Sequence, residues 1–325
     1  MTATELRDID ERDLLTRREH ADRLGDLGEL SRATALLGEL LPRFERHYGA
    51  AHVETLTTRD FHAHWIGEAG DPHYALNSFR EYLPEWEEIA GPEHPSTLHC
   101  RQNLSFWTGE CGDFAEAAAL CRSLLPVRER VLGSAHPDTL TTRHRLAYWT
   151  GEAGDNETAL GMLDELLATR VRLHGAGHPG TLTTRHERAR RIGEVGRPGE
   201  AAALFEEVLP LRAAAWGARN VSVLTTRHEL ARWTAESGDP ASARAQLEAL
   251  YPIRREVQGR DHPRTLTTAH ELARWTAMTG DAATARALAR DVLDRRRRVL
   301  GGTHPHTRST EALLASSPDP GKGQE

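Results

Sequence analysis

The chain has 325 residues, and its 48 acidic residues outnumber its 41 lysine and arginine residues, for a formal net charge of −7. This acidic balance argues against general nucleic-acid binding, which depends on excess positive charge. No apolar stretch approaches the ~18 residues of a membrane span, and the polar N-terminus lacks the apolar segment of a signal peptide, so the sequence predicts neither.

Three cysteines, Cys100, Cys111 and Cys121, are too few for a disulfide framework and form no CxxC pair. They are interpreted as free thiols, which fits a cytoplasmic location. The basic residues are arginines apart from Lys322, which indicates a GC-rich bacterial source.

A repeat of 42 residues organises the chain. The string His-Pro-x-Thr-Leu recurs at His94, His136 and His178 and again at His262, with partial copies at 52, 220 and 304. Each repeat is numbered here from position 0, the threonine of this string or its equivalent. Position 0 falls at residues 13, 55, 97, 139, 181, 223 and 265, and a partial eighth copy starts at 307.

Each repeat predicts two helices. The first, helix A, begins just after the proline, which suits a first helical turn, and ends at a glycine at position 15, such as Gly112. The second, helix B, follows about two residues later, carries alanine at position 20, such as Ala117, and ends at another glycine, such as Gly133. No alternating β pattern appears, so the sequence predicts an all-α fold.

One helix pair cannot bury both of its apolar faces, but stacked pairs can. The expected architecture is a solenoid over residues 10–315, with seven repeats and a short C-terminal capping helix from 307. Residues 1–9 are expected to be an N-terminal tail and residues 316–325 a disordered one.

The order Leu146-Ala147, Gly154, Ala159 and Leu163 in repeat four resembles the tetratricopeptide repeat. The 42-residue period and the His-Pro link resemble its kinesin-light-chain type, which is common in actinobacterial proteins. The resemblance covers residues 10 to 315. It implies a right-handed superhelix whose A helices line a concave, partner-binding groove.

The resemblance places positions 2, 5, 9 and 12 or 13 in that groove. Positions 5 and 9 supply the candidate partner-binding residues, which are Asp60, His64, Gln102, Phe106, His144, Tyr148, His186, Arg190, His228, Arg232, His270 and Arg274. The family's carboxylate clamp of lysine and asparagine is missing from these places.

Three further patterns recur. Tryptophan at position 10, as in Trp107, is expected to fill the space between neighbouring repeats. Arginine at position 4, as in Arg101, is expected to stack on tryptophan or to pair with a position-13 glutamate of another repeat. Arginine at position 31, together with the run from Arg295 to Arg298, is interpreted as a solvated helix face.

Eighteen histidines invite a metal hypothesis, but most are repeated linker residues with a structural role. His62 and His64 in repeat two break the pattern; only His64 shares a helix face with Asp60, and two ligands do not make a tight site. The sequence therefore predicts no metal, no cofactor and no catalytic residue.

The predicted function is a cytoplasmic adaptor or scaffold that binds a protein or peptide in its groove, with self-association left open. The alternative is an enzyme or small-ligand sensor with a pocket in repeats two and three. Its candidate residues are His62, Asn103, Tyr82 and Trp86.

Overall fold

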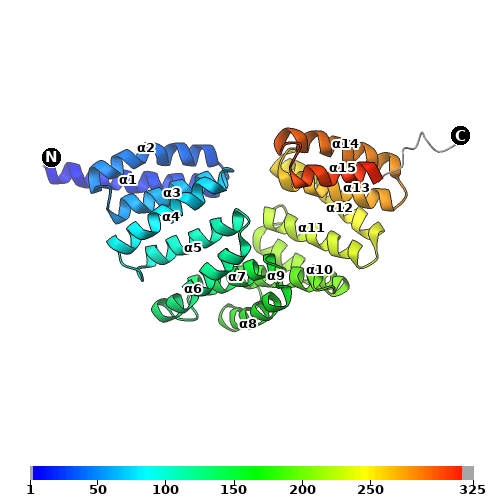
Figure 1. Ribbon diagram of the computed structural model, residues 1–325, viewed down its shortest axis with the longest axis horizontal. Helices are drawn as coiled ribbons and strands as arrows, with labels where there is room; N and C mark the ends of the chain where they lie inside the picture. Colours follow the sequence, from blue (N-terminus) through cyan, green and yellow to red (C-terminus); the bar gives the residue numbers. More distant parts are fainter. Residues whose placement is uncertain (1–2, 317–325) are drawn as a thin grey trace. The chain divides into compact units, whose positions relative to one another are not determined.

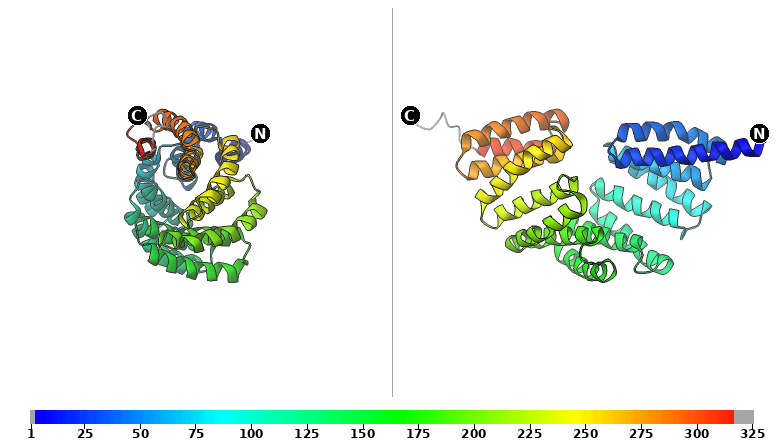
Figure 2. Two further views of the ribbon diagram at one scale, coloured as in Figure 1. Left: turned by 90° about the vertical axis from the view of Figure 1, so that its right-hand side faces the viewer. Right: turned by 180° about the vertical axis from the view of Figure 1, so that it is seen from behind.

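The computed structural model describes residues 3–316, with side chains described from residue 11. The described residues form fifteen α-helices and no strand, which confirms the predicted all-α fold (Figure 1). Consecutive helices pack on one another between residues 3 and 152 and between residues 179 and 316 (Figures 1 and 2). The expected solenoid of stacked helix pairs is therefore present.

Odd-numbered helices are the A helices and even-numbered helices the B helices of the repeats. Their bounds are α1 Ala3–Asp26, α2 Leu30–Tyr48, α3 Val53–Glu68, α4 Pro72–Ile89, α5 Pro95–Glu110, α6 Phe114–Leu132, α7 Pro137–Glu152, α8 Asn156–His174, α9 Pro179–Glu194, α10 Pro198–Trp216, α11 Val221–Glu236, α12 Pro240–Gln258, α13 Pro263–Met278, α14 Ala282–Val299 and α15 Pro305–Ser316. Helix α1 begins at Ala3, so the segment expected to be an N-terminal tail is helical from there. The C-terminal tail beyond residue 316 lies outside the described residues.

The helices group into two compact units. The N-terminal unit covers residues 1–162 and the C-terminal unit residues 163–325, with the boundary inside α8.

The His-Pro link builds the start of α5, α7, α9 and α13. The histidine is the N-cap, and its Nδ1 accepts a hydrogen bond from the backbone N–H two residues on; in α7 this bond joins Asp138 N to His136 at 3.2 Å. Proline follows in the first turn, where no N–H donor is needed. The position-0 threonine closes the loop, since Thr139 Oγ1 donates to Gly133 O at 2.8 Å. The structural role expected for the linker histidines is confirmed.

The tryptophan at position 10 packs between repeats, as predicted. Trp107 and Trp149 are both 2 % exposed, and each indole covers the position-12 glycine of the preceding A helix. A Cβ placed on Gly109 would lie 2.4 Å from the Trp149 ring. The position-12 glycine, which the sequence analysis did not single out, is what lets the ring approach so closely.

The interpretation of the position-31 arginines as a solvated face is wrong. Arg128, Arg212, Arg254 and Arg296 are only 2–4 % exposed, and Arg170 is 7 % exposed. Burial lowers the pKa of Arg212, Arg254 and Arg296 to about 10. In the run from Arg295 to Arg298, only Arg297 and Arg298 are exposed.

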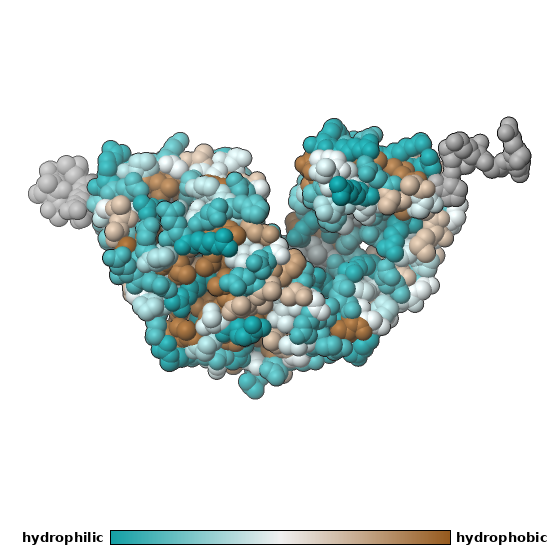
Figure 3. All heavy atoms as spheres, in the orientation of Figure 1, coloured by the Kyte–Doolittle hydropathy of each residue, from teal (hydrophilic) through white to brown (hydrophobic). Residues whose placement is uncertain are grey.

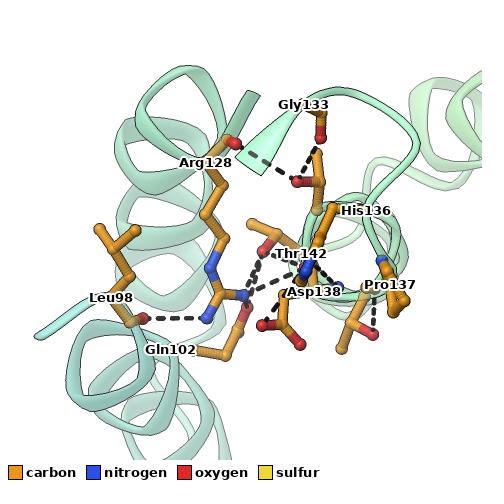
Figure 4. A network of polar contacts seen from close by, with 10 residues as sticks. Leu98, Gln102, Arg128, Gly133, His136, Pro137, Asp138 and Thr142 are labelled. Atoms are coloured by element: carbon orange, nitrogen blue, oxygen red, sulfur yellow. Dashed lines mark hydrogen bonds and ion pairs between the residues drawn. The ribbon is translucent and has the colours of Figure 1, made fainter. Parts of the chain in front are cut away.

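Backbone carbonyls replace water around these guanidinium groups. Arg128 lies on α6. It donates to Leu98 O (3.0 Å) in α5, the A helix of the same repeat, and to Asp138 O (3.1 Å) in α7, the A helix of the next repeat (Figure 4). It also donates to Gln102 Oε1 (3.0 Å) and Thr142 Oγ1 (2.7 Å). A buried charge is tolerated when it is hydrogen-bonded in this way. The arginine therefore ties three helices together.

The position-4 arginines find different partners from those expected. Arg101 pairs with Glu87 at 2.6 Å and Arg143 with Glu129 at 2.5 Å. Both glutamates lie at position 32 of the preceding B helix. Neither tryptophan stacking nor the position-13 glutamate is involved in these pairs.

Candidate functional site

A cavity of about 550 Å³ lies on the A-helix side of the N-terminal unit. Four successive A helices, α1, α3, α5 and α7, line it, with one residue from α4. The lining residues are Asp22, Asp26, Thr57, Asp60, Phe61, His64, Trp65, Trp86, Pro95, Ser96, His99, Asn103, Asp138 and Arg145. Most of the protein surface visible in Figure 3 is hydrophilic. This cavity, by contrast, combines aromatic rings with charged groups.

Asp60 is the most deeply buried carboxylate of the cavity, with 7 % of its surface exposed. It lies near the middle of α3, and the indole Nε1 of Trp86 donates to its two oxygens at 3.1 and 3.3 Å. Desolvation raises the pKa of Asp60 to about 7, although the hydrogen bond from Trp86 opposes that shift. The carboxyl group can therefore hold or release a proton near neutral pH.

Two histidines line the cavity in the neutral form. Burial lowers the pKa of His64 to about 4, and it also lowers the pKa of His99. The His64 ring packs edge-on against Trp65, with centroids 4.8 Å apart, and its buried Nδ1 has no hydrogen-bond partner among the described residues. A neutral imidazole of this kind can donate to or accept from a ligand.

Arg145 supplies the cation. Its guanidinium lies 4.4 Å from the Phe106 ring centroid, and no carboxylate oxygen of the described residues lies within 4.0 Å of it. Burial lowers the pKa of Arg145, while the charges of Glu110 and Glu68 partly offset that effect. The neighbouring Asn103 is 8 % exposed, and its side chain hydrogen-bonds to no other described residue. Both groups keep free hydrogen-bonding capacity toward the cavity.

The α1 wall is acidic. Asp22 accepts a hydrogen bond from Trp65 Nε1 at 3.1 Å, and burial raises the pKa of Asp22. Asp26 lies one turn further along the same helix. The cavity therefore has carboxylates on α1 and α3 and a guanidinium on α7, where Asp138 in the first turn adds one more carboxylate.

The structure brings some of the predicted residues together and separates others. Asp60, His64, Trp86 and Asn103 all line the cavity. His62 lies on the α2 side of α3, with Nε2 3.5 Å from a Cβ placed on Gly38. Tyr82 packs against Phe79, with centroids 6.3 Å apart, inside the core. Those two residues do not reach the cavity.

Apart from Asp60, the position-5 side chains expected to line the groove do not line the cavity. Gln102 is 5 % exposed and accepts from Arg128 and from Thr142. His186, His228 and His270 are each directed at the position-3 threonine of the next A helix, with Nδ1 3.2 to 3.4 Å from its Oγ1. These side chains fill the space between repeats, and His144 on α7 is also half-buried.

The position-9 side chains make different contacts in the two units. In the N-terminal unit, the Phe106 ring lies under the Arg145 guanidinium. The Tyr148 ring packs edge-on against Trp149, with ring centroids 4.8 Å apart. In the C-terminal unit, Arg190, Arg232 and Arg274 form ion pairs with glutamates.

Asn103 was predicted as part of an alternative pocket, but its place in the repeat, position 6, was not recognised as a cavity-lining position in the neighbouring A helices. Position 6 is Phe61, Asn103 and Arg145 in repeats two to four. It becomes Glu187, Glu229 and Glu271 in repeats five to seven. This change of residue type within an otherwise regular repeat was the signal that could have located the cavity. Also missed were Asp22, Asp26, His99 and Asp138.

Among the side chains described from residue 11 to residue 316, no three His, Cys, Asp or Glu groups are clustered as a metal site would require. None of the helices within residues 3–316 is both long and apolar enough to cross a membrane.

Comparison with known proteins identifies the repeat. The tetratricopeptide-repeat profiles match residues 97–138, 139–180 and 222–298. None of the curated proteins searched is similar to the chain.

Several solved structures are similar. Kinesin-light-chain TPR-like repeats from Podosopora anserina are 28 % identical over 64 % of this chain and 98 % of that one, with a TM-score of 0.54. BtubC from P. vanneervenii is 19 % identical over 71 % and 92 %, with a TM-score of 0.57. NprR in complex with its cognate peptide NprX is 12 % identical over 94 % and 87 %, with a TM-score of 0.61. Residues 97–180 and 222–298 therefore match tetratricopeptide repeats, and the chain is similar to solved repeats of the kinesin-light-chain type.

Proposed function

We propose that the chain is a scaffold that binds a peptide or an extended protein segment in the cavity lined by α1, α3, α5 and α7. The observation that carries this proposal is the pair Asn103 and Arg145, whose polar groups meet the cavity without a partner from the described chain. Neither side chain has a polar atom among the buried atoms without a hydrogen-bond partner, so both stay accessible to the polar groups of a ligand.

The position-6 glutamates of the C-terminal unit favour this location. Glu187 pairs with Arg190 at 3.0 Å and with Arg191 at 2.8 Å. Glu229 and Glu271 likewise face the position-9 arginines of their own helices. Because each glutamate lies within ion-pair distance of an arginine, these charges largely neutralise one another, although the buried Glu229 Oε2 accepts no hydrogen bond from the described residues.

The scaffold is compatible with peptide ligands. NprR was crystallised with its cognate peptide, and a Rap protein with Competence and Sporulation Factor. Both are under 25 % identical to this chain, so they support the use of the fold and say nothing of the ligand's sequence.

Selection from a random hexapeptide library with the purified full chain tests the proposal. We expect enriched peptides that lose affinity for Phe106→Ala and Arg145→Gln and keep it for Arg298→Gln, an exposed arginine on α14. Tyr148→Ala is expected to act in the same direction as Phe106→Ala. No enrichment, or equal binding by all the variants, contradicts the proposal.

A small-ligand sensor or an enzyme is the second candidate. The observation in its favour is Asp60, a buried carboxyl with a pKa of about 7 in a cavity with aromatic walls. Native mass spectrometry of the purified chain distinguishes the two functions. A stoichiometric small molecule released by Asp60→Ala would support this candidate over the peptide scaffold.

A cytoplasmic location, self-association, the absence of a nucleic-acid partner and an actinobacterial source stay predictions.

A further inference from the structure

Besides Asp22, Asp26 and Asp138, the cavity is lined by two charged groups of opposite sign, Asp60 and Arg145, that are at least half-buried and that the protein leaves incompletely satisfied. They lie on different A helices, Asp60 on α3 and Arg145 on α7, with α5 between them. A ligand that spans α5 meets both groups.

Asp60 has room for another donor. A carboxylate can accept about four hydrogen bonds, and Trp86 is the donor recorded for Asp60. Phe61, Trp65 and Trp86 surround the same space with aromatic rings. Aromatic faces and a carboxylate together favour an organic cation, such as an ammonium or a guanidinium group.

Arg145 requires the opposite charge. The guanidinium is stacked on Phe106, and no described carboxylate lies within ion-pair distance of it. Its planar fork suits a bidentate carboxylate, and Asn103 on the adjacent helix adds an amide donor.

We propose that the cavity selects a peptide segment with two charged side chains, a lysine or arginine received by Asp60 and an aspartate or glutamate received by Arg145 and Asn103. This inference rests on the proposed function, because it specifies the ligand of the same site. The basic side chain of the peptide lies on the α3 side of the cavity and its acidic side chain lies on the α7 side. The order of the two charges along α3, α5 and α7 is thereby fixed.

Two isosteric variants separate the two subsites. Asp60→Asn keeps an oxygen that can accept from Trp86 and removes only the negative charge. Arg145→Gln keeps an amide and removes the positive charge. Asp294→Asn and Arg298→Gln make the same exchanges at exposed sites on α14 and serve as matched controls. Circular dichroism melting shows that each variant is folded.

The experiment is a positional-scanning library of hexapeptides with acetylated N-termini and amidated C-termini, selected on the wild type and on each variant. We expect wild-type selection to require one basic and one acidic residue at a fixed spacing. Asp60→Asn should lose only the basic requirement and Arg145→Gln only the acidic one. Each should weaken the best wild-type peptide about 30-fold or more, as for removal of one partner of a buried charge pair.

The outcomes separate the two proposals. Enrichment of peptides without the paired charges overturns this inference and leaves the scaffold function standing. Charge requirements that neither variant changes also overturn it, because the charges then bind elsewhere. A wild-type chain that enriches no peptide contradicts the proposed function itself.

Discussion

The two units use the same repeat for different surfaces. In the N-terminal unit, positions 6 and 9 of the A helices carry aromatic, amide, imidazole and guanidinium groups around a cavity. In the C-terminal unit, the same positions carry glutamates and arginines that pair with one another. The repeat's caps, glycines and buried arginines are common to both units. The comparison teaches that this scaffold separates the residues that build a repeat from those that vary on the exposed side of its A helices.

The largest expected effect on stability concerns the buried position-31 arginine, compared between the two units. Arg128→Met should reduce the free energy of unfolding by about 4 kcal/mol, because it strands several buried acceptors. Arg212→Met should cost less, about 2 kcal/mol, since Arg212 donates to Leu182 O and Ser222 O over longer distances, 3.3 Å each. Guanidinium chloride unfolding followed by circular dichroism measures both losses. An equal or larger loss for Arg212→Met would show that the bond lengths do not reflect the energetics.

These arginines also show what the sequence could predict. The 42-residue period, the linker histidines and the glycines predicted every helix pair, because caps and apolar spacing are local features. The burial of Arg128 was not predictable from such features. Its partners are backbone carbonyls of two other helices, and a carbonyl's position depends on packing, not on residue type.

The site was predicted in part for the same reason. Asp60, His64 and Asn103 broke the repeat and were noticed, and all three line the cavity. Arg145 was missed because it is one residue from the expected position 5. On a helix, a one-residue shift rotates a side chain by about 100°. That rotation separates His144, which is half-buried and outside the cavity lining, from Arg145, which lines the cavity.

The next effect concerns pH, where buried groups of the two units act with opposite sign. The pKa of Asp60 is raised to about 7, so its contribution to stability is present below the unfolded pKa near 4 and is lost as the pH rises through 7. The pKa of His270 is lowered to about 4, so its contribution is present above the unfolded pKa near 6.5 and is lost as the pH falls.

Unfolding measured from pH 4 to pH 8 tests this difference. Relative to the wild type, Asp60→Asn should gain about 3 kcal/mol between pH 4 and pH 8, because the variant has no carboxyl group to ionise. His270→Asn should instead improve relative to the wild type as the pH falls from 6.5 to 4. Parallel pH profiles for Asp60→Asn and the wild type would show that Asp60 titrates normally.

A smaller effect is expected at the tryptophan contact. Gly109→Ala places a Cβ 2.4 Å from the Trp149 ring, so the indole must move, and the net loss should be about 2 kcal/mol. Gly161→Ala is the matched control, since nothing lies within 4 Å of its Cβ position. That change should stabilise α8 by up to about 1 kcal/mol, as expected for glycine in a helix. In the C-terminal unit, Ala235 already holds the equivalent place, with Trp275 only 3 % exposed.

Thermal unfolding compares the two glycine variants directly. A stabilising Gly109→Ala would mean that Trp149 yields freely. The N-terminal unit would then tolerate alanine at position 12 as the C-terminal unit does.

The smallest effect concerns the position-4 arginines at the surface. Arg101→Gln removes the ion pair with Glu87, whose two side chains are 27 % and 39 % exposed, and it should cost under about 1 kcal/mol. Arg227→Gln in the C-terminal unit should cost less still, because the corresponding residue of the preceding B helix is Ala213. Added salt should reduce the first loss and leave the second unchanged, since screening weakens exposed pairs. Equal salt dependence of the two variants would mean that the Arg101–Glu87 pair contributes nothing to the difference between the units.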